Sequence, residues 1–576
     1  MAAPQLELHN RKTFDRFKLP KPSTLYYTVL LICLAFVVLY PILLIALNTF
    51  QVGRFGTQTT FGFENWRIAF EDPKLKSSLI KTISLALSRQ AIAVAVGIFL
   101  AWLIAMTDLP GKKWFEFGFW IAVFMPVLSV TLSWILILDN FNGLANRLVE
   151  LLPFVDKGPF NIYSYWGIQW VHLMTGTLPV KIMLLSPAFR NMDSSLEEAS
   201  RIAGRGAFGT LMKITIPIMT PAILISVVLG IIRSLEAFEV ELILGVPQKI
   251  DVYSTMIYRL VVQSPPQYGA ASVLSIVALL FVLPMVLLQQ YISSHKNYAT
   301  VSGKHSSRLF KLGRWKWPAF VLVGCIIAVM TVIPAIMLLL STFTKIFGHF
   351  EKTMWTLDHW KTILDVTGFT KSLLNTLIIS GGGALLTIPL VFLIAYISVR
   401  TKYRGRGAID FLSWLTTTVP GIIMGLSFLW LFLKTPILKG MYGTVGVLIL
   451  VVILANMTLG AQLIKSTMVQ IGNELEEASL ISGASWLYTL RRIIFPLVAP
   501  AVTVVFVYTF ASAAKTVSYF ALLSTPKNKP LALLQLDMMA DGSLEKATVV
   551  GVILLVLTVG AALVAKAFGM NSELRH

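Results

Sequence analysis

Two adjacent carboxylates near the middle of this chain recur, with their surroundings, at a fixed offset of 279 residues. Residues 196–223 read LEEASRIAGRGAFGTLMKITIPIMTPAI, and residues 475–502 read LEEASLISGASWLYTLRRIIFPLVAPAV. Thirteen of these 28 positions are identical. We name residues 194–217 the first EEAS loop and residues 473–496 the second EEAS loop. A polar stretch repeated inside a very apolar chain points to a function that the chain needs twice.

Each EEAS loop has the signals of a short helix. Ser194 can cap a helix whose third residue is Glu197, and Asn473 and Glu476 hold the same places in the second copy. Carboxylates in a first turn are also favoured by the helix dipole. The pattern predicts a capping box at the start of both helices.

The far end and one side of each helix are built from small residues. Gly204 and Gly483 follow where a left-handed residue would end a helix of about 13 Å. Ala199 and Ala478 keep one side slim enough for close approach. An interfacial helix that merely anchors the loop would look the same in one copy. The same pattern at equivalent places in two copies favours a docking surface for a two-fold partner.

The composition is that of a membrane protein. The chain has 576 residues, 56% hydrophobic and 13% charged, with a mean hydropathy of +0.75. A soluble protein of this length carries roughly 25% charged residues, and many apolar runs here reach the roughly 20 residues that span a bilayer as a helix. The formal charge of +20 lies in short loops and a tail, which fits the positive-inside rule better than nucleic-acid binding. We expect an all-α polytopic membrane protein in contact with lipid.

The apolar runs predict about twelve transmembrane helices as two six-helix repeats. A basic tail at 1–24 precedes the first repeat at 25–292, and a basic linker at 293–317 precedes the second repeat at 318–568, which leaves 569–576 at the end. The expected spans are 25–48, 79–106, 117–138, 163–186, 218–243, 270–292, 318–343, 372–398, 409–433, 443–467, 497–522 and 547–568.

The two repeats are predicted to be parallel and related by a pseudo-two-fold axis along the membrane normal. Residues near the start of each half match at offsets of 293 and 294, among them Thr82 with Thr376 and Pro126 with Pro420. The two prolines lie inside the third spans, which they are expected to kink. The offset falls to 279 by the EEAS loops, which indicates about fifteen extra residues in the loop 139–162 of the first half. Basic segments share one side in this count, so both termini, the linker and both EEAS loops are expected in the cytoplasm.

The segment E-E-A-S-x-x-x-G followed by I-x-x-P resembles the EAA loop of type I ABC importer permeases, the membrane subunits of binding-protein-dependent uptake systems. The resemblance covers essentially the whole chain and is to the fused two-unit form seen among ferric iron permeases, with thiamine and phosphonate systems as relatives. In that family the loop is a coupling helix that docks on an ATPase subunit. The resemblance therefore implies these ATPase-coupling positions: Glu197, Glu198, Ala199, Gly204, Glu476, Glu477, Ala478 and Gly483.

The resemblance also implies partners. It predicts two copies of a cytoplasmic ABC ATPase, an extracytoplasmic solute-binding protein and a place in the bacterial inner membrane. The sequence lacks G-x-x-x-x-G-K-[ST], so ATP and Mg²⁺ are expected on the ATPase and no cofactor on this chain. The histidines show no ligand spacing, so no metal site is expected. We expect a non-catalytic permease subunit of an importer, with ferric iron as its substrate; the alternatives are other small-solute ABC uptake and a gradient-driven secondary transporter.

Charged residues inside expected spans are costly and usually face a cavity or one another. The fifth span of the first half is expected to hold Arg233, Glu236, Glu239 and Glu241. Its counterpart holds Lys515, which aligns with Glu236. One hypothesis is an outer gate in which Glu236 meets Lys515 across the axis. The alternative is that Arg233 and Glu236, three residues apart on one helix, pair with each other. Arg89 also lies in apolar surroundings.

Overall fold

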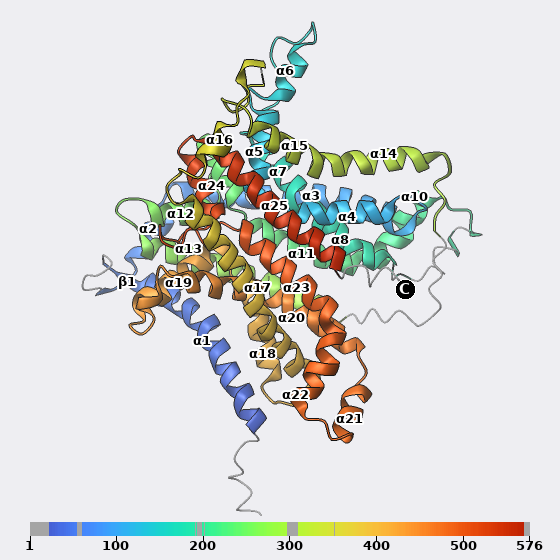
Figure 1. Cartoon of the computed structure of the whole chain (residues 1–576), viewed down its shortest axis with the longest axis vertical. Coiled ribbons are helices and arrows are strands. Elements are labelled where there is room, and N and C mark those ends of the chain that lie inside the picture. The colour runs from blue at the N-terminus through green and yellow to red at the C-terminus, as the bar shows by residue number, and fades with distance from the viewer. Residues whose placement is uncertain are drawn as a thin grey trace, which may run out of the picture.

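The structure is a computed structural model that describes residues 22–53, 60–190, 192, 199–200, 202–295, 309–350 and 352–568 (Figure 1). Most of the described residues are helical, as expected, and the two short strands among them form one small antiparallel pairing in which Gln51 lies opposite Phe61.

The first half runs from α1 to α13. Its elements are α1 (Pro22–Phe50), β1 (Gln51–Val52), β2 (Thr60–Phe61), α2 (Glu64–Glu71), α3 (Lys74–Met106), α4 (Lys112–Phe124), α5 (Val127–Leu138), α6 (Leu144–Glu150), α7 (Tyr165–His172), η2 (Leu173–Thr177), α8 (Leu178–Arg190), α10 (Ala207–Thr210), η3 (Leu211–Thr215), α11 (Ile216–Leu235), η4 (Glu241–Gly245), η5 (Val246–Gln248), α12 (Tyr253–Val262) and α13 (Tyr268–His295).

The second half runs from η6 to α25. Its elements are η6 (Gly313–Trp315), α14 (Lys316–Ile327), η7 (Ala328–Val332), α15 (Ile333–Ser341), η8 (Lys352–Met354), α16 (Asp358–Thr362), α17 (Phe369–Arg400), α18 (Arg406–Leu415), η9 (Thr416–Thr418), α19 (Gly421–Lys434), η10 (Lys439–Met441), α20 (Val445–Gln470), α21 (Glu474–Ile481), α22 (Trp486–Thr489), η11 (Leu490–Ile494), α23 (Phe495–Lys515), α24 (Leu531–Ala540) and α25 (Leu544–Phe568).

Every expected span coincides with a helical segment. The described residues contain nine helices long and apolar enough to cross a membrane, and eleven when two bent pairs are each counted as one span. The remaining expected span, 163–186, is the continuous run of α7, η2 and α8, and it carries several buried polar side chains. Large apolar side chains along α1, such as Val29, Ile32 and Leu43, are exposed, as a lipid-facing helix requires.

The third span of each half is broken at the matching proline. α4 and α5 meet at 99°, and α18 with η9 meets α19 at 111°. Met125 and Val419 precede Pro126 and Pro420 and are extended, because a residue before proline is pushed out of the helical region. The two matched prolines therefore bend both third spans, as the sequence suggested.

The fifth spans end earlier than expected. We expected 218–243 and 497–522, whereas α11 ends at Leu235 and α23 ends at Lys515. After α11 the chain passes through a short non-helical stretch into η4, and after α23 it continues as a non-helical segment up to α24. Glu236 and Glu239 consequently lie just beyond the helix rather than on it.

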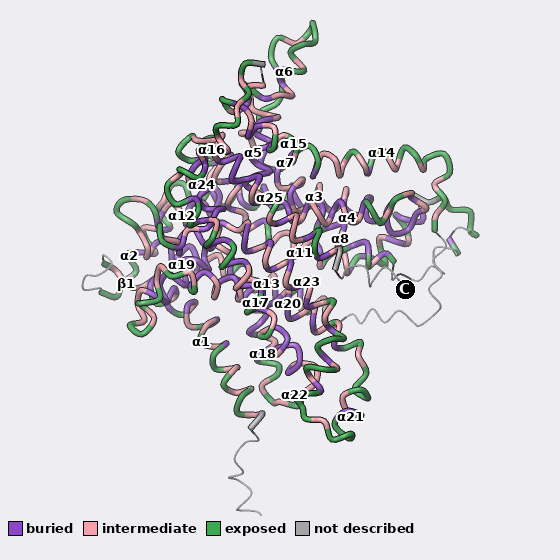
Figure 2. The backbone as a smooth tube through the Cα atoms, in the orientation of Figure 1, coloured by how far each residue is buried: buried purple, intermediate pink, exposed green. Residues whose placement is uncertain are grey.

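The two halves exchange their first helices. α1 packs against α18 and α19 of the second half, and α14 and α15 pack against α4 and α5 of the first half. The Thr28 and Tyr403 hydroxyls lie 3.0 Å apart, and Ser133 Oγ donates to the Pro334 carbonyl at 2.8 Å. Figure 2 shows buried residues concentrated where the two halves meet and exposed ones toward the outer ends. The fused chain therefore forms one interlocked body.

Equivalent hydrogen bonds recur in the two halves, as expected of two repeats of one fold. Thr82 Oγ1 accepts from the Tyr253 amide at 2.9 Å, and Thr376 Oγ1 accepts from the Leu531 amide at 2.8 Å. Each bond joins the second span of its half to the start of the short helix, α12 or α24, that follows the fifth span.

The end of the linker lies along the end of α3. Phe310 donates its amide to the Met106 carbonyl at 2.8 Å, and Leu312 donates its amide to Asp108 Oδ1, also at 2.8 Å. Lys316 Nζ lies 3.5 Å from the same carboxylate. The Leu312 amide and the Lys316 ammonium hold the pKa of the Asp108 carboxyl below its usual range. Residues 1–21 of the predicted tail and 296–308 of the predicted linker lie outside the described residues.

Candidate functional site: the EEAS loops and the contact between the halves

The second EEAS loop folds as a short helix followed directly by the fifth span. α21 covers eight residues, and both Glu477 and Ala478 on it are exposed. Glu476 turns inward, where its Oε1 accepts a 2.6 Å hydrogen bond from the Tyr396 hydroxyl. Trp486 Nε1 donates to the same hydroxyl at 2.8 Å. The two glutamates therefore differ: one fixes the loop to α17, and the other is free to meet a partner.

The predicted capping box is wrong in the second EEAS loop. Asn473 is the N-cap residue, but its side chain makes no capping bond; Arg400 donates to its Oδ1 instead. Glu476 is likewise engaged by Tyr396. Two neighbours from α17 therefore compete successfully for both members of the box. In the first EEAS loop, Ser194, Glu197 and Glu198 lie outside the described residues.

The described parts of the two EEAS loops make equivalent hydrogen bonds. The Ser200 and Thr210 hydroxyls lie 2.9 Å apart, and the Ser479 and Thr489 hydroxyls lie 2.8 Å apart. All four residues are buried, whereas Ala199 is exposed like its counterpart Ala478. In each half this bond fastens the loop helix to the start of the next helix.

Both predicted helix-ending glycines adopt the left-handed conformation. Gly204 has φ +80° and Gly483 has φ +84°. A Cβ at either position would meet no atom within 4 Å, so backbone conformation alone demands glycine there.

A π-helical turn precedes the same proline in both halves. η3 stands two residues before Pro217, and η11 stands two residues before Pro496. The wider turn gives the proline ring room against the carbonyl four residues back, where it would otherwise clash. α10, η3 and α11 form one continuous helical run, as do α22, η11 and α23, and the hydroxyl pair ties the preceding loop helix to the first turn of that run. Figure 1 shows α10 and α21 at the ends of two diverging groups of helices.

Comparison with known proteins agrees with this geometry. Residues 388–569 match the family described as binding-protein-dependent transport system inner membrane component. The ferric transport system permease protein FbpB of Actinobacillus pleuropneumoniae is 29% identical over 420 residues, which cover 69% of this chain but only 57% of that protein. The Fe(3+)-transport system permease protein FbpB 2 of Haemophilus influenzae is 22% identical over 534 residues, 92% of this chain and 96% of that protein. These matches, one of which spans 92% of the chain, support a permease of the binding-protein-dependent type.

A solved structure of a bacterial alginate ABC transporter, in complex with a periplasmic protein, contains a chain that is 19% identical. It covers 45% of the permease and 95% of its own length, with a TM-score of 0.37.

The hypothesis that Glu236 meets Lys515 is wrong for this structure. Arg233 Nη1 lies 3.1 Å from Glu236 Oε2, which is the alternative pairing along one helix end. Lys515 Nζ instead donates to the Val123 carbonyl and reaches the Met125 carbonyl at 3.5 Å. These carbonyls stand at the broken end of α4, where a cation is favoured by unpaired C=O groups and the helix dipole.

A second contact joins the halves beside this lysine. Glu239 Oε1 accepts a 3.2 Å hydrogen bond from the Val517 amide of the second half. The permease therefore holds its halves together with a lysine that caps the α4–α5 break and a glutamate that holds the turn after α23. We name these two contacts the inter-half contact.

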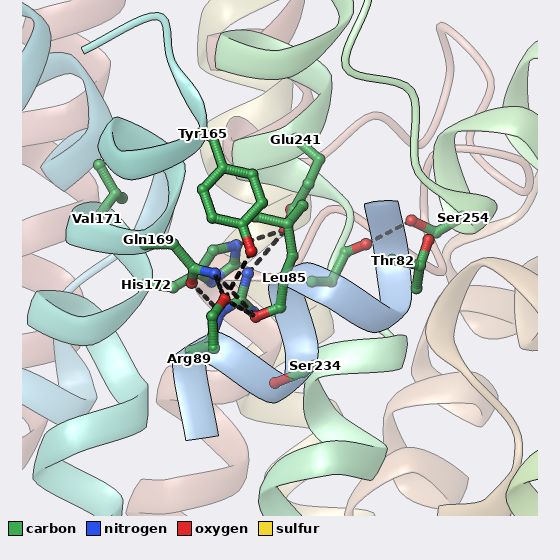
Figure 3. Close-up of polar contacts among 12 residues, drawn as sticks. Thr82, Leu85, Arg89, Tyr165, Gln169, Val171, His172, Ser234, Glu241 and Ser254 are labelled. Atoms are coloured by element: carbon green, nitrogen blue, oxygen red, sulfur yellow. Dashed lines mark hydrogen bonds and ion pairs between the residues drawn. The ribbon is translucent and has the colours of Figure 1, made fainter. Parts of the chain in front are cut away.

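Sequence reasoning noted Arg89 and Glu241 separately but missed the buried polar cluster that they form in the first half (Figure 3). Arg89 lies 3.1 Å from Glu241, and His172 Nε2 lies 2.8 Å from the same carboxylate oxygen. Gln169 completes the group by accepting from Arg89 Nε at 3.2 Å. These residues come from α3, α7 and η4, so no sequence spacing reveals them. Among the described residues no group of three His, Cys, Asp or Glu side chains could hold a metal ion.

Proposed function

We propose that the permease is the membrane subunit of an ATP-driven importer. Its two six-helix halves form the solute path, and its two EEAS loops dock on two copies of an ABC ATPase. The observation that carries this is the same bonded loop in both halves, with its hydroxyl pair, left-handed glycine and π-helical turn. Two equivalent rigid loops suit a motor made of two equivalent subunits.

Energy enters through the ATPase partner. The permease sequence has no phosphate-cradling G-x-x-x-x-G-K-[ST] loop, so ATP and Mg²⁺ bind to the partner in this proposal. The described docking positions are Ala199, Gly204, Glu476, Glu477, Ala478 and Gly483; Glu197 and Glu198 complete the set. Because Glu476 is engaged by Tyr396, we assign Glu477 the direct contact and Glu476 the support of the loop.

The opposite face receives an extracytoplasmic solute-binding protein. α6 lies at the far end of the molecule from α21 (Figure 1), in the extra segment 139–162 that only the first half carries. With the EEAS loops in the cytoplasm of a bacterium, the termini lie there too, and α6 faces outward from the inner membrane.

The proposed substrate is ferric iron. Two relatives that carry ferric or Fe(3+) transport in their names match the chain, one of them over 92% of its length. The stretch EAFEVELILGVP resembles the same subgroup. We infer that the inter-half contact must open for transport. Lys515 and Glu239 then take the gate role first considered for Glu236 with Lys515, and the Arg233–Glu236 pair lies beside them.

The test is co-purification of the ATPase encoded beside the permease after mild detergent extraction. We expect two ATPase copies per permease, and we expect E198R with E477R to release them. E474R is the matched control, because Glu474 lies in the same α21 turn but outside the repeated motif. Equal loss of ATPase in the control, or solute accumulation without any ATPase, would contradict the proposal; the second result would favour a gradient-driven transporter.

A further inference from the structure

The buried polar cluster ties three separate segments of the first half to one carboxylate. Arg89 is 2% exposed and Glu241 1% exposed, and Glu241 Oε1 takes both Arg89 and His172. Gln169 is itself fixed, because its Nε2 donates to the Leu85 carbonyl at 2.9 Å. Figure 3 shows these side chains converging from α3, α7 and η4.

The second half shows that this fold packs without such a cluster. At the offsets that align the halves, the four polar positions correspond to small or apolar residues, all buried: Gly383, Leu448, Val451 and Phe520. Burying an ion pair is often no more stabilising than apolar packing of the same volume. The polar set is therefore not explained by stability of the six-helix unit.

The cluster fixes the position of the segment that follows α11. Glu241 stands two residues after Glu239, whose carboxylate accepts from the Val517 amide of the other half. Glu241 Oε2 is buried and has no hydrogen-bond partner among the described residues. Arg89 and His172 both contact the same oxygen of the Glu241 carboxylate. These two contacts therefore determine where the segment after α11 lies.

We propose that Arg89 and His172 are positioning residues: by holding Glu241 they place Glu239 at Val517 and so set the inter-half contact. The inference rests on the proposed gate role of that contact. Gln169 orients Arg89 within the same arrangement. The second half needs no counterpart, because Glu239 itself holds the Val517 amide in its segment after α23.

Cross-linking measures this placement without any transport assay. Cysteines replace Glu239 and Ser518, the native Cys33 and Cys325 become alanine, and a protease site is inserted in the linker. Because this removes the Glu239 carboxylate, the cross-linking rate reports where the Glu241 anchor alone places residue 239. A short bifunctional thiol reagent then keeps the halves joined after cleavage when the two cysteines are close. We expect H172V to slow cross-linking about tenfold, the change expected for losing one charge-assisted hydrogen bond. H172Q keeps a donor toward Glu241 and should restore the rate.

The matched control is Q90A with S234A. Gln90 Nε2 donates to Ser234 Oγ at 3.1 Å between α3 and α11, and both positions are buried alanines in the second half. This pair is buried and polar but does not touch Glu241, so its loss should leave the cross-linking rate unchanged. Slowing equal to that of H172V would overturn the proposal, as would an unchanged rate in H172V.

A second variant covers misfolding. R89G, Q169L, H172V and E241F together install the residues of the second half, so the core is packed while the anchor is gone. We expect it to melt like the unmodified permease and still to cross-link slowly; normal cross-linking would refute the positioning role.

Uptake of radiolabelled ferric citrate, measured separately in cells, reports on the proposed function. If cross-linking follows our expectation but the unmodified permease takes up no ferric citrate, the proposed substrate is rejected and the positioning role is not.

Discussion

Replacing the left-handed glycine of an EEAS loop should weaken ATPase docking by a calculable amount. A Cβ on Gly483 would touch nothing, so G483A adds no clash and its cost is that of holding alanine at φ +84°. That cost is about 1–2 kcal/mol. If docking requires the observed loop geometry, the affinity for the ATPase falls by the corresponding factor, about 5- to 30-fold. The measurement is the dissociation constant of the permease in lipid nanodiscs for the purified ATPase.

Three variants make this prediction specific. G206A is the matched control, because Gly206 is equally open but lies outside the left-handed region; it should bind normally. G483N should retain most affinity, since asparagine tolerates the left-handed conformation better. G204A should repeat the effect of G483A, and the double variant should multiply the two losses, because the loops are far apart. Equal binding by G483A and G206A would refute the reasoning that docking selects this backbone geometry.

Three further outcomes are expected. R89G removes the guanidinium that pairs with the buried Glu241 carboxylate and should lower the free energy of unfolding by about 3–5 kcal/mol. The fourfold exchange with the residues of the second half should restore thermal stability in detergent. A stable R89G would show that the carboxylate is not held as described. K515M removes the cation from the end of α4 and should raise ATP hydrolysis in the absence of substrate, measured as phosphate release, while K515R should not. D108N loses the anion that holds the Leu312 amide and Lys316, so trypsin should cut the linker end faster than in the unmodified chain. Because the Asp108 pKa is lowered on folding, its contribution is present at neutral pH and lost as the pH falls through that lowered pKa. Cleavage by pepsin, which works in acid, should therefore speed up for the unmodified chain relative to D108N as the pH falls, until the two are cut at equal rates.

The architecture was predictable because lipid imposes a simple rule on sequence. A span must be apolar for about 20 residues, and the two halves repeat, so each expected span could be checked against its partner. Pro126 and Pro420 predicted the two bends for the same reason: the missing N–H and the restricted preceding residue act locally. The left-handed Gly204 and Gly483 followed from equally local backbone chemistry.

The contacts of charged side chains were not predictable, because they depend on which segments meet. Asn473 and Glu476 have the spacing of a capping box, yet Arg400 and Tyr396 from another helix take both side chains. Lys515 aligned with Glu236 in the repeat, but hydropathy continued past the true ends of both fifth spans. The carbonyls exposed at the α4–α5 break then offered the lysine a nearer partner.

One crossing shows how far the repeat constrains the interior. Spans two, four and five meet at three aligned positions, which are Gly97, Lys181 and Ser226 in the first half and Val391, Gly460 and Val505 in the second. In the first half a Cβ on the glycine would lie 2.9 Å from the lysine Cβ; in the second, a Cβ on the other glycine would lie 3.1 Å from the Val391 side chain. The helices approach equally closely, but the glycine has changed sides. The repeat therefore preserves helix spacing and leaves the chemistry of each crossing free, so a polar cluster present in one half only has been kept for something other than spacing.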